Sequence, residues 1–181
     1  QSLRESGVVF EKITLIEDIK FNVSYFDSVC SMNVLNTTPY HYLKRIDGSL
    51  TNKFLPDYFT LNAERVFLVL EQYKNWGMCT EEVRRILANI YVRYLFSALQ
   101  RNCDKRSDMN YAQRKEWLKQ QYKTPLCKEL LSAVQASGTL FKCMAKAFCA
   151  GNIPLCLMIA RSIFAVKSAF PTVFSTLKQQ H

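Results

Sequence analysis

Apolar residues recur at helical spacing through most of this chain, with helix start and stop signals between successive segments. This 3.6-residue period predicts helices over residues 61–76, 80–101, 111–122, 124–138, 141–150 and 154–168. Gly77 is placed to end the first helix and Thr80 to cap the second. Thr124 followed by Pro125 opens the fourth, which we expect to end at Gly138. The Phe, Leu, Ile and Met stripes on these helices are expected to form a core.

The first third of the chain has a mixed pattern. Phe10, Ile13 and Leu15 are spaced as in an extended strand, and the apolar positions that follow predict a helix over residues 16–31. Short strands are expected at residues 33–36 and 40–43, followed by a turn at residues 45–51. The sequence therefore predicts a mainly α protein with two parts: residues 1–55, which hold one helix and short strands, and residues 56–181, which are all-helical.

Two adjacent carboxylates, Glu17 and Asp18, fall in the first turn of the helix expected at residues 16–31. Unpaired backbone N–H groups and the helix dipole favour negative charge at this position. Stabilisation of the helix is therefore one explanation for the pair. Catalysis by a carboxylate is the other.

A longer series of motifs favours catalysis. In order, the series reads Glu17-Asp18-Ile19-Lys20-Phe21-Asn22, Val34-Leu35-Asn36, Pro39-Tyr40-His41-Tyr42-Leu43-Lys44-Arg45 and Gly48-Ser49-Leu50-Thr51. It resembles the C-terminal part of the catalytic domain in family 2, GT-A-fold glycosyltransferases of bacterial surface-polysaccharide synthesis. In that family an E-D-x-x-F pair opens a helix behind the acceptor site, and a Tyr-x-Tyr strand and a Ser-containing loop follow. The resemblance covers residues 1–55, which would form the end of the GT-A α/β domain.

The resemblance implies roles for five residues. Asp18 would be the catalytic base of an inverting transfer, and Glu17 would orient Asp18 or a sugar hydroxyl. His41 would reach the donor phosphates or the metal, while Lys44 and Arg45 would offer positive charge to the leaving diphosphate. The structural alternatives are a helix-capping Glu17, a histidine hydrogen-bonded within a sheet, and two solvated loop cations.

The sequence lacks the motifs that such an enzyme needs to bind its donor. No D-x-D occurs among the six Asp residues, and no Gly-rich phosphate-binding loop is present. We therefore expect a chain without the nucleotide-sugar-binding half, with no cofactor and no activity of its own. The full-length parent would use Mn²⁺ or Mg²⁺ to transfer a sugar from a nucleotide-sugar donor to a glycan or lipid-linked acceptor.

The net charge of +9 points to an anionic partner, such as a phosphorylated donor, an acidic membrane surface or nucleic acid. No recognised nucleic-acid motif accompanies the basic residues, so we predict no nucleic-acid partner. The rival to the glycosyltransferase is a non-catalytic basic helical interaction module that binds a protein partner or an anionic surface.

Seven cysteines are scattered without a C-x-x-C pair, which favours reduced thiols in a cytoplasmic protein and argues against a zinc site. The longest uncharged apolar run, residues 147–160, is too short and too broken by Gly151 and Pro154 to span a bilayer. Apolar residues between 141 and 168 predict a core, a face that meets the inner side of the membrane peripherally, or a face covered by the missing catalytic half. They are Phe141, Met144, Phe148, Leu155, Met158, Ile159, Ile163 and Phe164.

Overall fold

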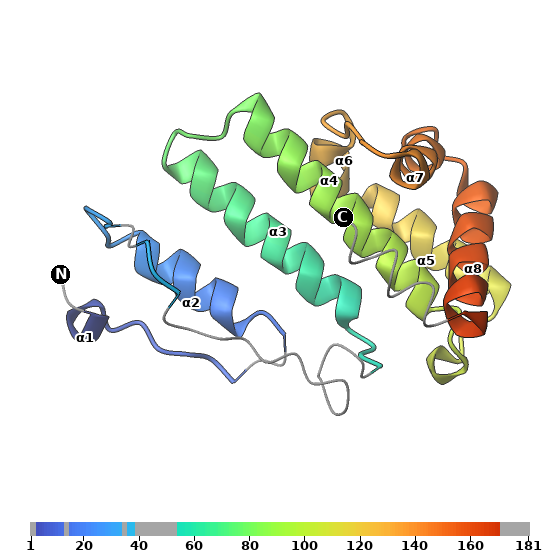
Figure 1. The fold of residues 1–181 in the computed structure, drawn as a ribbon, viewed down its shortest axis with the longest axis horizontal. Coiled ribbons are helices and arrows are strands. Elements are labelled where there is room, and N and C mark those ends of the chain that lie inside the picture. Colours follow the sequence, from blue (N-terminus) through green and yellow to red (C-terminus); the bar gives the residue numbers. More distant parts are fainter. Residues whose placement is uncertain (1–2, 13–14, 34–35, 39–53, 171–181) are drawn as a thin grey trace.

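The structure, a computed structural model, describes residues 3–12, 15–33, 36–38 and 54–170. Helices dominate these ranges (Figure 1), which confirms the mainly α prediction. The α-helices are α1 (Leu3–Ser6), α2 (Glu17–Phe26), α3 (Tyr58–Asn75), α4 (Glu81–Arg101), α5 (Tyr111–Lys123), α6 (Pro125–Leu131), α7 (Thr139–Cys149) and α8 (Ile153–Ala169). A 3₁₀ turn, η2 (Lys105–Ser107), lies between α4 and α5.

None of the described residues belongs to a strand. Phe10 and Leu15, expected in a strand, precede α2 without regular structure. The Phe10 ring instead stacks on that of Phe21 in α2, with centroids 4.0 Å apart, so its apolar character reflects packing on a helix. Residues 40–43 and the middle of the 33–36 segment lie outside the described residues.

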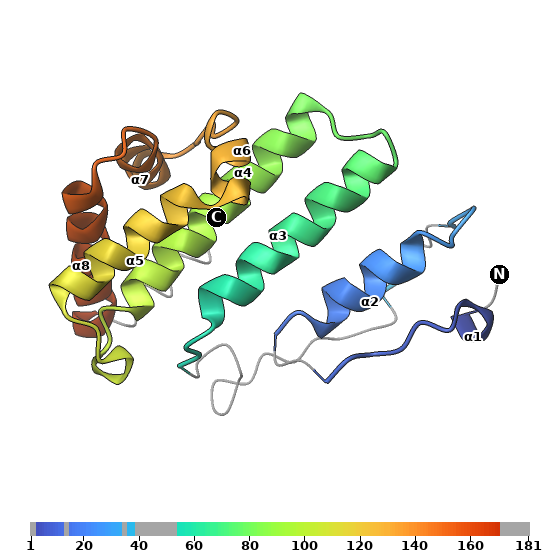
Figure 2. The ribbon, with the colours of Figure 1, turned by 180° about the vertical axis from the view of Figure 1, so that it is seen from behind.

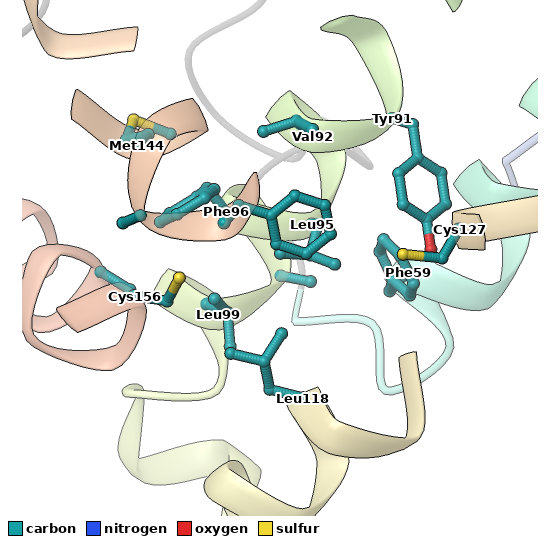
Figure 3. Close-up of a cluster of buried hydrophobic side chains, with 14 of the residues drawn as sticks. Phe59, Tyr91, Val92, Leu95, Phe96, Leu99, Leu118, Cys127, Met144 and Cys156 are labelled. Atoms are coloured by element: carbon teal, nitrogen blue, oxygen red, sulfur yellow. The ribbon is translucent and has the colours of Figure 1, made fainter. Parts of the chain in front are cut away.

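Helix α4 is the centre of the fold. It packs against α3, α6, α7 and α8, and its buried positions occupy much more than one stripe of its circumference. A helix covered on so many sides must be apolar over most of its surface. Figure 3 shows its side chains meeting those of neighbouring helices; the labelled cluster comprises Phe59, Tyr91, Val92, Leu95, Phe96, Leu99, Leu118, Cys127, Met144 and Cys156.

The start and stop signals act at three of the expected positions. Thr80 caps α4 by accepting the Val83 N–H at 3.3 Å, and Thr124 caps α6, with Pro125 as its first residue. Gly77 ends α3 in a left-handed conformation (φ +66°). Its N–H and that of Met78 turn back to carbonyls of the last helical turn, which is the Schellman arrangement.

The expectation of one helix from 124 to 138 is wrong. α6 ends at Leu131, and Gly138 (φ +81°) instead precedes α7. The interruption is held by Asn89 of α4, whose side-chain amide donates to the Gln135 carbonyl at 2.8 Å and whose Oδ1 accepts the Gln135 N–H at 3.1 Å. Contacts from another helix thus replace the backbone bonds that a longer α6 would have made.

Candidate functional site

The acidic pair lies where the sequence predicts, at the first turn of α2. Ile16 precedes the helix, is fully buried and provides no capping side chain. Asp18 is exposed, and its Oδ1 accepts the N–H of Ile19 at 2.8 Å. One carboxylate oxygen of Asp18 therefore serves the helix terminus, while the side chain as a whole remains open to solvent.

Glu17 has a different environment from its neighbour. Its Oε2 is buried and has no hydrogen-bond partner. A buried carboxylate oxygen without a donor costs more free energy than an exposed one, and such atoms are uncommon in folded proteins. No described residue near the start of α2 supplies the hydrogen bond that this buried oxygen lacks.

Lys20, one turn further along, fixes this end of α2. Its ammonium lies 2.8 Å from a carboxylate oxygen of Glu64 in α3 and 3.5 Å from one of Glu11 in the segment before α2. The hydrogen bond to Glu64 is the main reason that the pKa of Lys20 is raised. Lys20 thus ties three segments together beside the acidic pair.

The other end of α2 is held by α3, which lies beside it in both views (Figures 1 and 2). The side-chain amide of Gln72 lies 2.7 Å from the carbonyl oxygen of Val23 and 3.3 Å from Oδ1 of Asp27. The same Asp27 oxygen accepts the indole N–H of Trp76 at 3.1 Å. These bonds connect two helices and set the direction of α2.

An open cavity of about 750 Å³ lies beside this junction. Phe26, Tyr73 and Trp76 contribute aromatic side chains to its lining, and Met32 lines it as well. Asp27 follows Asp18 by nine positions, which is about 13 Å along a helix axis. The cavity therefore lies at the opposite end of α2 from the acidic pair and does not form one site with it.

The remaining predicted site residues, His41, Lys44 and Arg45, lie outside the described residues. Their roles stay predictions. Sequence reasoning missed the Gln72, Asp27 and Trp76 contacts, because they join residues more than 40 positions apart. The available signal was Gln72 itself, which with Asn62 is one of two polar residues on the inner face of α3.

Within the described ranges, no cluster of three or more His, Cys, Asp or Glu side chains has the geometry to hold a metal ion. A scan against protein-family models and searches of curated proteins and of solved structures found no match to this chain. None of the helices in the described part of the chain has both the length and the apolar character needed to cross a bilayer.

Proposed function

We propose that this chain is the C-terminal part of a family 2, GT-A-fold glycosyltransferase that builds a surface polysaccharide. Residues 1–55 would end the α/β catalytic domain, with the Tyr-x-Tyr strand at residues 40–43, outside the described residues. The observation that carries the proposal is the E-D-x-x-F series with an exposed Asp18 at the start of α2. The parent would transfer a sugar from a nucleotide-sugar donor to a glycan or lipid-linked acceptor.

In this proposal Asp18 acts as general base. Its carboxylate takes the proton of the acceptor hydroxyl while that oxygen attacks the anomeric carbon, and the bond to the nucleoside diphosphate breaks with inversion. The exposure of Asp18 supports this role, because an acceptor must reach it from solvent. The hydrogen bond from Ile19 to Oδ1 fixes the carboxylate, which leaves Oδ2 to receive the proton.

Glu17 would assist rather than react. Its buried, unpaired Oε2 supports a position in which a sugar hydroxyl, or another donor brought by the donor-binding half, completes the hydrogen bonding. A divalent metal bound in that half would neutralise charge on the leaving diphosphate. The residues of this chain would bind and orient the acceptor and accept its proton.

The test is Asp18→Asn in the full-length parent. Loss of a general base typically lowers the rate about 10²–10⁴-fold, so kcat should fall by that factor with little change in the Kd of the donor. Asp57→Asn is the matched control, because it makes the same change at an exposed Asp that forms no side-chain cap for its helix. Equal kcat for Asp18→Asn and the unaltered enzyme would overturn the assignment.

A second arm uses the chain by itself. Incubated with a panel of nucleotide sugars and Mn²⁺, it should release no nucleotide above the blank, because the sequence contains no D-x-D motif for metal and diphosphate. Turnover by this chain alone would contradict the proposal that donor binding resides elsewhere.

The rival function is a basic helical module that binds a protein partner or an anionic surface without catalysis. The net charge of +9 favours it. If the rival is right, the full-length parent has no transferase activity, and Asp18→Asn changes no measurable function.

A further inference from the structure

The two faces of α8 differ in what they contact. Its inner face is buried against α4, α5 and α7 through Cys156, Leu157, Ile159 and Ala160. Positions 154, 158, 161, 162, 165, 168 and 169 follow the i, i+4, i+7, i+8, i+11, i+14, i+15 spacing of one helix face, opposite the buried one. All seven side chains are exposed: Pro154, Met158, Ala165 and Ala169 are apolar, whereas Arg161, Ser162 and Ser168 are polar.

The outer face of α8 carries a single charged side chain, although a solvent-facing helix ordinarily presents several. Met158 is 59% exposed, and Val166 (51%) and Phe170 (59%) extend the apolar surface toward the end of the helix. Arg161 is the charged side chain on this face. Lys167 points the other way and donates a hydrogen bond to Gln100 of α4.

The residues that the sequence predicts as a membrane-facing surface are mostly not the ones exposed on the outer face of α8. Phe141, Met144, Phe148 and Ile159 are buried in the core, so for these four the core prediction holds. Of the eight apolar residues between 141 and 168 that were named from the sequence, only Met158 is exposed. The apolar surface that remains open is therefore the outer face of α8 and not the face that packs on α4.

The charged residues in the C-terminal part of the sequence have one sign. No Asp or Glu follows Glu129 in the sequence, whereas Lys or Arg occurs at positions 142, 146, 161, 167 and 178. Lys142 and Lys146 are exposed one turn apart on α7, which packs against α8. No acidic side chain from this part of the sequence neutralises them.

We propose that the outer face of α8 rests on the surface of an anionic lipid bilayer. Met158, Val166 and Phe170 would enter the headgroup boundary, and Arg161 would contact lipid phosphates, assisted by the field of Lys142 and Lys146. Nucleic acid would satisfy the cations but would leave the exposed apolar side chains without a favourable contact. This inference does not depend on the proposed sugar transfer.

The experiment is flotation of the full chain with vesicles of phosphatidylcholine alone or with about 30% phosphatidylglycerol. We expect binding to the anionic vesicles, weaker binding as salt is raised, and no binding to the neutral ones. Met158→Glu should weaken binding at least tenfold, because it places a charge within the apolar face. Met78→Glu is the matched control, since Met78 is 58% exposed in the connection between α3 and α4.

The cations are tested separately. Each of Lys142→Ala and Lys146→Ala should weaken vesicle binding about fivefold. The pair Lys115→Ala and Lys119→Ala on α5 has the same spacing but includes Glu116 within it, so we expect a smaller effect. Circular dichroism of every variant checks that the helices are retained.

Three results would overturn the proposal. One is the absence of flotation with anionic vesicles at low salt. Another is equal weakening by Met158→Glu and Met78→Glu, which would indicate a purely electrostatic surface that any polyanion satisfies. The third is a dimer that Met158→Glu converts to monomer while vesicle binding is unchanged, which would make a second copy the occupant of this face.

Discussion

Gln72 of α3 completes the hydrogen bonding of the last turn of α2 by donating its side-chain amide to the carbonyl oxygen of Val23, 2.7 Å away. Val23 is one of the last four residues of α2, whose carbonyls have no partner within the helix. The Gln72 side chain is nearly buried, with 7% of its surface exposed. The helix that carries Asp18 thus depends on α3 for its C-terminal end.

Replacing Gln72 with Met should destabilise the protein by about 1–3 kcal/mol, because it leaves a part-buried carbonyl unpaired while keeping similar side-chain volume. Urea unfolding followed by circular dichroism measures the change. Gln120→Met on the exposed side of α5 is the control and should change stability by less than about 0.5 kcal/mol. Equal effects would mean that the bond to Val23 contributes nothing.

Helix α2 should open before α4. No residue of α2 is fully buried, whereas α4 lies at the centre of the core, and local opening is easiest where few apolar contacts are lost. Native-state hydrogen exchange should therefore show α2 amides exchanging at least about tenfold faster than those in the middle of α4. Equal protection would show that the two helices unfold as one unit.

The seven thiols should differ in reactivity according to their exposure to solvent. Cys30, Cys143 and Cys149 are exposed, and Cys127 and Cys156 are buried with their pKa raised by burial to about 11. Because the thiolate is the reactive form, the buried pair should react with an aromatic disulfide reagent only after unfolding. Mass spectrometry of the labelled native protein identifies the sites. Modification of Cys127 before Cys30 would contradict the packing around α6.

Because of the same two thiols, we expect the folded protein to lose stability at alkaline pH. Their folded pKa of about 11 lies above the ordinary value of 9.0, so the folded state holds these protons more tightly than the unfolded one. Their stabilising effect is complete below pH 9.0 and is lost as pH rises toward about 11, with a slope of up to about 1.4 kcal/mol per pH unit for each thiol. Urea titrations across this range measure it, and Cys156→Ala should give a shallower decline. An unchanged slope would assign the loss to other groups, such as Tyr91 and Tyr122, whose pKa is also raised by burial.

Periodicity and capping residues predicted most of the helical part because those signals are local. Thr80 and Gly77 act on neighbouring backbone, and their effect is visible in a short stretch of sequence. The error at Gly138 has a non-local cause, since Asn89 holds residue Gln135 away from a helix. The strand-like spacing before α2 also failed, because Phe10 packs on Phe21 and not within a sheet.

The candidate site, like the fold, was predictable only where it depends on local sequence. The first-turn position of Glu17 and Asp18 follows from the local sequence pattern. The ion pair of Lys20 with Glu64 and the hydrogen bond from Gln72 to Val23 depend instead on which helices pack together. The roles given to both carboxylates stay predictions, as does the division at residue 55, across which α2 contacts α3.

The central place of α4 also matters for synthesis of the protein. Its partner α8 begins at Ile153, and α4 ends at Arg101, so the 51 residues 102–152 must be made before α8 starts. At 5–20 residues per second this takes about 3–10 s. The same interval separates the two helices as they leave the ribosome, and until α8 emerges the side of α4 that bears Phe96 and Leu99 lacks its final cover. We expect this surface to be the one that nascent-chain chaperones bind.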